Sequence, residues 1–294
     1  MPQVRGLHHV TAVTASARGN LAFWRDVLGL RFVKKTVNFD DPSVYHLYYG
    51  DELGRPGSAM TFFAWEHMAP GRRGAGEVAE TQLAVPTGAL GWWAARLATA
   101  GCDTARGERF GEPRLAFRDP DGLDLALVEA ADDAREPWTT ESVTADVAIR
   151  GFHGVTLALA DTAPTADLLT GLMDYGARGE EGGRVRLHAP AGSAARILDL
   201  APTSSPPARL GAGSVHHVAF SVADRNAQDA VRAALVDAGF QVTPPIDRDY
   251  FHAIYFRTPG GVLFEVATDE PGFTVDEPAA KLGTALKLPR RHEH

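Results

Sequence analysis

The chain has 294 residues, of which 45% are hydrophobic and 22% charged, and its formal net charge is −8. This length is large for one hydrophobic core and comfortable for two domains. Lysine and arginine are scattered along the chain, whereas a nucleic-acid-binding protein normally carries a basic face, so nucleic acid is not an expected partner.

The cellular compartment can be inferred from three features. No apolar run reaches the length of a membrane span, so a membrane is not an expected partner. The first residues show no signal-peptide pattern. The single cysteine, Cys102, cannot form an intrachain disulfide. We therefore expect a cytoplasmic protein.

The predicted elements repeat four times along the chain. Each repeat opens with a β-rich strand and continues into a helix with apolar residues three or four apart. The four opening strands are predicted at residues 9–13, 82–85, 154–158 and 217–220. Glycine readily adopts the left-handed conformation that closes many helices. The helices are therefore expected to end at Gly29, Gly101, Gly176 and Gly239.

The second and fourth repeats also share their closing segments. Residues 117–126 align with residues 256–265, and both segments contain a predicted hairpin turn, Pro-Asp-Gly in one and Pro-Gly-Gly in the other. Each repeat is therefore a βαβββ unit. The sequence predicts an α+β fold in which four such units pair into two domains with curved, mostly antiparallel sheets.

A polar, acidic and proline-containing stretch separates the two pairs of units. We expect an N-terminal domain at 1–133, a linker at 134–148 and a C-terminal domain at 149–270. The periodicity fades beyond that point, and residues 271–294 are predicted to be a tail that wraps the surface. The histidines at its end, His292 and His294, are interpreted as part of a solvated terminus.

A histidine doublet occurs twice, as His8-His9-Val10 and as His216-His217-Val218. About fifty residues after the second copy, Glu265 interrupts an otherwise apolar strand. Side chains alternate between the faces of a strand. Glu265 should therefore point into the concavity of the sheet while its apolar neighbours pack under the helix. An unpaired carboxylate there would be costly, so a cation is its natural partner.

Comparison of the repeats narrows the ligand set. The position of Glu265 is Ala126 in the second unit, and the position of His9 is Gly154 in the third. Only the outer units therefore supply ligand-type residues, and His9, His217 and Glu265 form the predicted metal site. For His8, His153 and His216, a role in tuning the site and a structural role both stay open. His46 is interpreted as structural.

The ligand number favours oxygen chemistry. Two histidines and one carboxylate are typical of non-haem ferrous oxygenases, in which three coordination positions stay free. A fourth protein ligand, which would favour Lewis-acid chemistry, does not occur at a matching strand position. Tyr255 lies on the strand facing Glu265, where its phenol is suited to hydrogen bonding or proton donation to a bound substrate. A core tyrosine with its hydroxyl at the rim is the alternative.

On these residues the chain resembles the vicinal oxygen chelate superfamily, whose members are built from paired βαβββ units. Within that superfamily it is similar to ring-cleaving dioxygenases that act on hydroquinones. The resemblance covers nearly the whole chain and is carried by residues 7–11, 29–40, 45–48, 57–61 and 257–265.

The resemblance implies specific roles and a reaction. It implies Fe(II) held by His9, His217 and Glu265, although Mn(II) also suits this ligand set. It further implies that a second group of residues assists the reaction: His8, Thr11, His216, Arg248 and Tyr255. The reaction implied is the opening of a 1,4-dihydroxybenzene ring by O2, so a small aromatic molecule and O2 are the expected partners.

Three other functions remain as alternatives at this point. They are an extradiol catechol dioxygenase, a glyoxalase-like metal-dependent isomerase or thiol transferase, and a metal-free protein that binds aromatic or drug-like molecules. Fold analogy does not separate them, because one fold hosts many activities. The sequence also leaves open whether identical chains associate into a homo-oligomer.

Overall fold

The computed structural model describes residues 4–190 and 195–292, and it contains the four predicted βαβββ units. The first unit comprises β1 (Leu7–Thr14), α1 (Ala17–Leu21) with its continuation η1 (Ala22–Val27), β2 (Arg31–Val37), β3 (Tyr45–Gly50) and β4 (Ala59–Ala64). The second comprises β5 (Glu77–Val85), α2 (Leu90–Thr99), β6 (Ala105–Arg109), β7 (Glu112–Arg118) and β8 (Asp124–Glu129). The third comprises β9 (Gly151–Leu159), α3 (Ala163–Leu172), β10 (Gly176–Glu181), β11 (Arg184–His188) and β12 (Ile197–Pro202). The fourth comprises β13 (Val215–Val222), α4 (Arg225–Asp237), β14 (Ile246–Asp247), β15 (Phe251–Arg257) and β16 (Leu263–Pro271).

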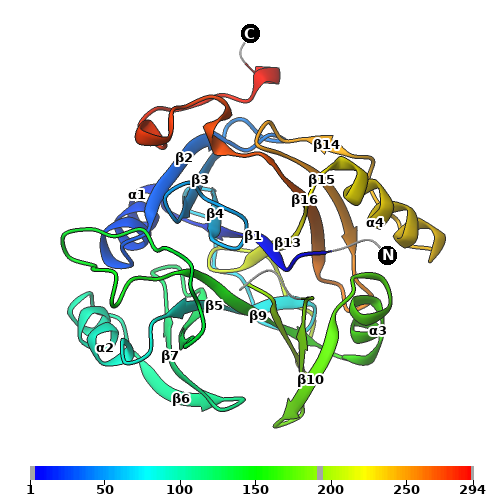
Figure 1. Ribbon diagram of the computed structural model, residues 1–294, viewed down its shortest axis with the longest axis horizontal. Helices are drawn as coiled ribbons and strands as arrows, with labels where there is room; N and C mark the ends of the chain where they lie inside the picture. Colours follow the sequence, from blue (N-terminus) through cyan, green and yellow to red (C-terminus); the bar gives the residue numbers. More distant parts are fainter. Residues whose placement is uncertain (1–3, 191–194, 293–294) are drawn as a thin grey trace.

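The units pair into two curved, eight-stranded sheets, which we call the first and second half-barrels. The first half-barrel joins the first and fourth units in the order β14-β15-β16-β13-β1-β4-β3-β2. The second joins the middle units in the order β10-β11-β12-β9-β5-β8-β7-β6. The sheets lie back to back, and their concave faces open in opposite directions (Figure 1). Each half-barrel therefore combines one unit that precedes the predicted linker with one unit that follows it. The boundaries of the linker and of the two predicted domains remain a prediction.

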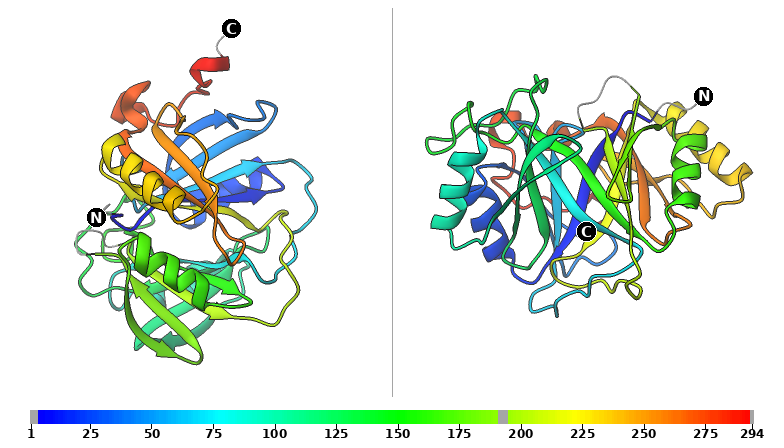
Figure 2. Two further views of the ribbon diagram at one scale, coloured as in Figure 1. Left: turned by 90° about the vertical axis from the view of Figure 1, so that its right-hand side faces the viewer. Right: turned by 90° about the horizontal axis from the view of Figure 1, so that it is seen from below.

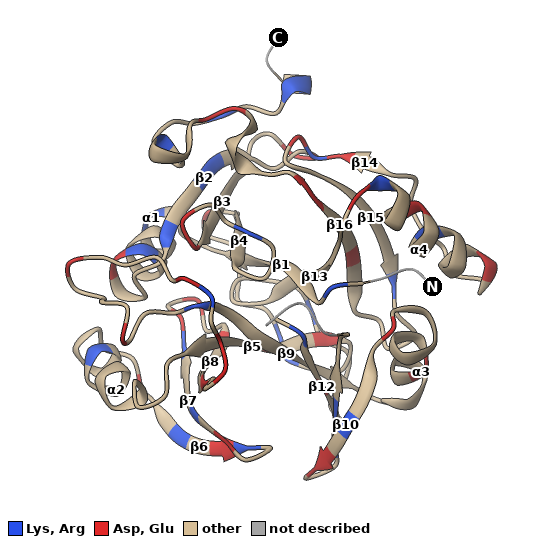
Figure 3. Cartoon of the chain, in the orientation of Figure 1, with Lys and Arg blue, Asp and Glu red and all other residues tan. Residues whose placement is uncertain are grey.

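Helices cover the outer faces, and one core connects both sheets. Figure 2 shows α1 and α2 at one end of the molecule and α3 and α4 at the other. Apolar side chains beneath the helices, such as Trp24, Trp93, Leu169 and Val231, belong to a single buried cluster that spans both half-barrels. Acidic and basic residues are spread over both half-barrels (Figure 3). Among the described residues, none of the helices is long and apolar enough to cross a membrane.

Helix ends follow the prediction at three of four glycines. Gly29, Gly101 and Gly239 have positive φ angles of 72°, 78° and 89°. The prediction was wrong at Gly176, which opens β10, because Asp174 takes the left-handed conformation there, with φ 60°. The first helix also widens from Ala22 onward into π-type turns, a feature that apolar spacing does not distinguish from an α-helix.

Residues 134–148 and the tail pack against the half-barrels. The guanidinium of Arg135 donates to the carbonyl oxygens of Gly57 and Phe152, at 2.9 and 2.8 Å, which holds the linker segment on the body of the protein. The tail contains three short 3-10 turns, Phe273–Val275, Ala279–Lys281 and Arg290–His292. It crosses the open side of the first half-barrel (Figure 1).

Candidate metal centre

Three neighbouring strands of the first half-barrel bring the predicted ligands together. His9 lies on β1, His217 on β13 and Glu265 on β16, and these strands are adjacent in the sheet. Their ligand atoms all lie within 4.8 Å of one another. The two histidine Nε2 atoms are 3.3 Å apart, and Glu265 Oε2 lies 3.4 Å from that of His9 and 2.9 Å from that of His217. Within the described ranges this is the one such group of histidine, cysteine and acidic side chains.

The surroundings of Glu265 fit a cation. The side chain is fully buried, and neither carboxylate oxygen has a hydrogen-bond partner among the described residues. Two neutral imidazoles do not compensate the charge of a buried carboxylate, whereas a cation held by all three side chains would. Ligand atoms about 2.1 Å from an ion and at right angles to one another are about 3.0 Å apart, close to the separations found here.

The charge states of Glu265 and His217 also suit metal binding. Burial acts to raise the pKa of Glu265, but His9 and His217 outweigh it and hold the pKa well below its usual value. Burial lowers the pKa of His217, against the opposing effect of Glu265. A carboxylate and neutral imidazoles are the forms in which these side chains bind metals.

The first histidine of each doublet contacts the second. His8 and His216 each lie at a register shift between β1 and β13. This β-bulge turns His8 toward His9 and His216 toward His217. The Nδ1 atoms are 2.9 Å apart in the first doublet and 2.8 Å apart in the second. Burial is the main reason that the pKa of His8 and that of His216 fall to about 3, so both rings are neutral. If His9 and His217 donate from Nδ1 to these neutral rings, their Nε2 lone pairs point at the shared site.

A cavity of about 450 Å³ opens beside the triad. Its wall includes Phe39, His46, Phe63, Trp65, His216 and Tyr255. Tyr255 is paired with Glu265 across β15 and β16, as predicted from the hairpin. Burial, and then the charge of Glu265, raise the pKa of the Tyr255 phenol well above its usual value, so the phenol keeps its proton.

Arg248 connects Tyr255 to the mouth of this cavity. Its Nε donates to Tyr255 Oη at 3.3 Å, and its Nη2 donates to Asp40 Oδ2 at 3.0 Å. Asp40 also accepts from Arg291 of the tail at 3.2 Å. Because the phenol oxygen accepts from Arg248, the phenol can donate its own proton, and Glu265 is an acceptor within reach.

Of the five residues expected to assist the reaction, three line the cavity and two lie buried beside it. Arg248, Tyr255 and His216 are in the wall, whereas His8 and Thr11 are buried and are not. Thr11 contacts Thr61, with 2.8 Å between their hydroxyl oxygens.

Sequence reasoning did not find the polar chain that continues from Thr11. His46 Nε2 lies 2.9 Å from the Thr61 hydroxyl, and Tyr48 Oη lies 2.8 Å from His46 Nδ1. His46 thus lies in the cavity wall, and burial, the first of several causes, keeps its pKa well below the usual value. The parallel pairing of β1 with β4 brings Thr11 beside Thr61. No local sequence pattern predicts that pairing.

Two other histidines are not part of the triad. His153 is in the second half-barrel, where its Nε2 lies 3.1 Å from Glu112. His292 contacts the backbone oxygen of Phe39 at 3.1 Å, and His294 lies outside the described residues.

Comparison with known proteins places the chain in a family. The model of the Glyoxalase/Bleomycin resistance protein/Dioxygenase superfamily matches residues 6–127 and 134–266. A Bacillus subtilis (strain 168) protein named "Putative ring-cleaving dioxygenase MhqO" is 44% identical over 98% of this chain and 92% of its own. The "Chlorohydroquinone/hydroquinone 1,2-dioxygenase" of Sphingobium indicum is 38% identical over 97% of this chain and 92% of its own.

Solved structures agree on the fold. The crystal structure of a "putative dioxygenase" from Bacillus subtilis superposes with a TM-score of 0.97 at 43% identity, covering 100% of this chain and 94% of that one. Glyoxalase I from Zea mays has a TM-score of 0.65 at 15% identity, covering 90% of this chain and 92% of its own, which shows the shared fold alone. The four βαβββ units and the two family matches lead to one conclusion: the chain belongs to the glyoxalase/bleomycin resistance protein/dioxygenase superfamily.

Proposed function

We propose that the chain is a ring-cleaving dioxygenase that opens a hydroquinone-type ring with O2, using Fe(II) held by His9, His217 and Glu265. The observation that carries the proposal is the buried Glu265 carboxylate, which has no hydrogen-bond partner among the described residues and lies beside two imidazole Nε2 atoms. The named activity of the 38% identical Sphingobium indicum relative supports the substrate class.

The chain's own groups are suited to bind and orient such a substrate. A ferrous ion with three protein ligands keeps open positions, and it would supply the electron transfer between substrate and dioxygen. The aromatic rings of Phe39, Phe63 and Trp65 give a single-ring substrate an apolar wall. The Tyr255 phenol keeps its proton and can donate it to a ring oxygen, while Arg248 fixes the direction of that phenol.

His216 adds a second donor. If His217 donates from Nδ1 to His216 Nδ1, the neutral His216 ring carries its proton on Nε2. His216 lines the cavity, and we infer that this N–H donates to the substrate or to an oxygen atom of O2.

The direct test is anaerobic loading of the metal-free protein with Fe(II), followed by measurement of oxygen uptake with hydroquinone, chlorohydroquinone and catechol. We expect uptake with both hydroquinones, and mass spectrometry with labelled O2 should find two labelled oxygen atoms in one ring-opened product. Stoichiometric iron without uptake across this panel would overturn the proposal, and uptake with catechol alone would favour an extradiol enzyme instead.

The remaining alternatives differ in metal dependence. An isomerase or thiol transferase would work without O2 and with a redox-inert ion such as Zn(II). A metal-free binding protein would keep its ligand affinity after His9→Ala. Metal analysis of protein purified without an affinity tag distinguishes Fe(II) from Mn(II). We also infer a cytoplasmic location from the single cysteine. The sequence leaves open whether identical chains form a homo-oligomer, and light scattering would measure this.

A further inference from the structure

The second half-barrel repeats the strand register of the first, position by position. Thr11 pairs with Thr61 and His217, and Thr156 pairs in the same way with Asp199 and Glu80. Both central strand pairs also carry their two β-bulges at corresponding places. The corresponding residues are His9 and Gly154, His217 and Glu80, Glu265 and Ala126, His216 and Ala79, Tyr255 and Ala116, Phe63 and Ala201, and His46 and Arg184.

The metal triad has no counterpart in this register. Gly154 and Ala126 carry no ligand atom, and Glu80 is bonded to arginines. Arg109 Nη1 lies 2.8 Å from Glu80 Oε1, and Arg114 contacts the other carboxylate oxygen. The second half-barrel is therefore not a second copy of the metal centre.

Small side chains replace the large ones of the first cavity. Ala79, Ala116 and Ala201 stand where the first half-barrel has a histidine, a tyrosine and a phenylalanine, and all three line the concave face. The result is a cavity of about 1000 Å³, compared with about 450 Å³ beside the metal triad. Its wall combines the three alanines with charged side chains, and the cavity is wide enough for an organic molecule.

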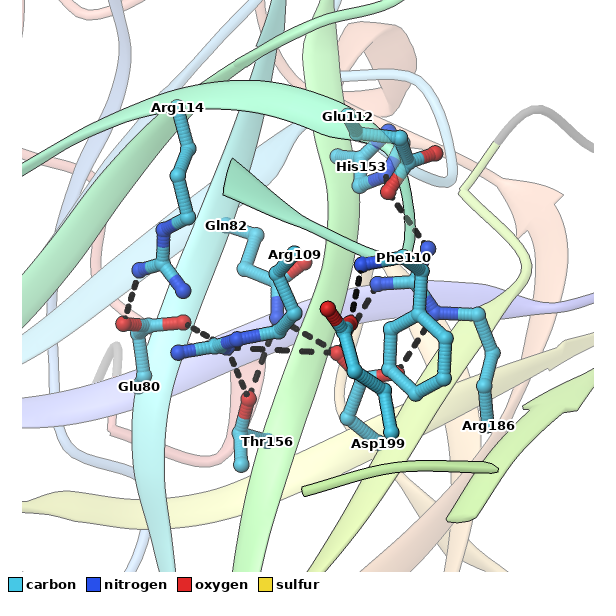
Figure 4. A network of polar contacts seen from close by, with 11 residues as sticks. Glu80, Gln82, Arg109, Phe110, Glu112, Arg114, His153, Thr156, Arg186 and Asp199 are labelled. Carbon is cyan, nitrogen blue, oxygen red and sulfur yellow. Dashed lines mark hydrogen bonds and ion pairs between the residues drawn. The ribbon is translucent and has the colours of Figure 1, made fainter. Parts of the chain in front are cut away.

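A network of ion pairs lies on the same sheet (Figure 4), and its members Glu80, Arg109 and Thr156 line the cavity. Arg186 donates to both oxygens of Asp199, at 2.7 and 2.9 Å, and also contacts Glu112. Gln82 donates to Asp199 at 3.2 Å. Each carboxylate of the network is thus bonded to at least one arginine.

Arg184 is the cation of this region without such a partner. It lines the cavity, is partly buried, and forms no side-chain hydrogen bond or ion pair with any residue that the structure describes. Burial, and then repulsion from Arg109, lower its pKa against the attraction of Glu80 and Asp199, and these two carboxylates are bonded to other arginines. Its guanidinium can therefore accept an anion without giving up an existing contact.

The acidic groups near the mouth do not neutralise Arg184. Asp124 is bonded to Arg118 at 2.7 Å and to Arg73 at 3.0 Å. Asp119 accepts the backbone N–H groups of the β7–β8 turn, and Asp103 is exposed at the rim.

We propose that the cavity of the second half-barrel binds a small organic anion, with carboxylate or phosphate oxygens on Arg184 and an apolar body against the alanine-lined wall. The alanines supply room, and the surplus guanidinium supplies the charge. This site is separate from the metal centre and does not depend on the reaction proposed there.

Isothermal titration calorimetry of the full-length protein with benzoate, inorganic phosphate and uncharged benzyl alcohol tests the proposal. We expect one equivalent of benzoate or phosphate to bind, and benzyl alcohol not to bind. Arg184→Gln should weaken binding by about tenfold, because a charge-assisted pair is lost, whereas Arg184→Lys should keep part of the affinity. Ala201→Phe, which restores the bulk found at Phe63, should abolish benzoate binding without changing any charge.

Two control variants locate the bound anion. Tyr255→Phe changes only the first cavity, and Arg178→Gln removes an exposed arginine of β10, so both should bind like the wild type. The proposal fails if no anion binds to the wild type, if Arg184→Gln and Ala201→Phe bind like the wild type, or if either control weakens binding equally. Arg184→Gln removes no ion pair, so it remains a valid test even if Ala201→Phe does not fold.

Discussion

Two β-bulges let each histidine doublet act as a unit. Neighbouring residues of a regular strand point to opposite faces, so His8 would turn away from His9. At the bulges, His8 and His216 instead face the rings of His9 and His217, with their Nδ1 atoms 2.9 and 2.8 Å apart. Each doublet therefore combines a candidate ligand with the group that fixes its tautomer.

At the same scale, Glu265→Gln should separate metal binding from folding. Without metal, the variant should keep the fold but unfold at a lower temperature, because it loses the attraction to His9 and His217 that holds the pKa of Glu265 well below its usual value. Fe(II) added under argon should raise the melting temperature of the wild type, since the ion binds only the native state, but not that of the variant. Calorimetry measures both effects. Equal stabilisation of the two proteins by Fe(II) would show that Glu265 is not a ligand.

Tyr255→Phe tests proton donation. Removing a positioned proton donor should lower kcat/KM by about a hundredfold, while the bound iron stays unchanged. Oxygen uptake and metal analysis on the same samples measure the two quantities. Tyr175→Phe is the matched control, because this buried phenol has no hydrogen-bond partner among the described residues and lies away from the cavity. Loss of iron in Tyr255→Phe would instead indicate a structural role.

Asp119 should make stability depend on pH. Burial raises its pKa from 3.8 to about 6, so the folded carboxyl binds its proton more tightly than the unfolded one. Stability is then lost as the pH rises from about 4 to about 6, by about 3 kcal/mol for a shift of about two units. Urea unfolding of the wild type and Asp119→Asn at pH 4 and pH 7 isolates this effect. The free-energy difference between them should move in favour of the variant at pH 7, and a constant difference would contradict the assignment.

At the scale of elements, the tail is held to β2 by a buried cation. Lys34 is fully buried, and its Nζ lies 2.5 Å from Asp276 and 2.5 Å from Glu277. Phe273 packs on Tyr48 and Tyr250, with ring centroids 5.1 Å away in both cases. The tail is therefore part of the folded first half-barrel and reaches the mouth of the metal-site cavity.

Lys34→Met should loosen this attachment. The variant leaves Glu277 buried without its cation, which should cost about 3 kcal/mol of unfolding free energy. Lys34→Met combined with Glu277→Gln should recover part of the loss. Urea unfolding measures the stability, and limited proteolysis detects earlier cleavage after residue 271. Lys35→Met, at the neighbouring position on β2, is the control, and equal effects at both positions would contradict the explanation.

How much the sequence could predict differs between elements. The strands and the triad followed from the repeats, because each doublet and Glu265 lie in strands with clear apolar alternation. The first and fourth units share one half-barrel, so that β1 lies beside β13. The only indication of this pairing in the sequence is that the middle units lack ligand-type residues. The bulges and the chain from Thr11 to Tyr48 depend on strand register, which no local pattern specifies. Asp174 replaced the expected glycine at a helix end, because aspartate also tolerates the left-handed conformation.

At the scale of the whole molecule, the metal centre depends on both ends of the chain. His9 lies in the first unit, whereas His217 and Glu265 lie in the last, so the site forms only when β1 and β13 are paired. The same buried apolar cluster continues into the second half-barrel through residues such as Leu83 and Leu157. The two half-barrels should therefore unfold together.

Leu157→Ala tests this coupling from the half-barrel without the metal triad. Leu157 is fully buried on β9, and its truncation should cost about 2–5 kcal/mol. If one core stabilises the whole molecule, the denaturant midpoint of Fe(II)-dependent oxygen uptake should fall together with that of circular dichroism. Leu210→Ala, at a side chain that is 49% exposed, should change neither midpoint. Oxygen uptake that persists after the variant has lost part of its circular dichroism signal would mean that the first half-barrel folds on its own.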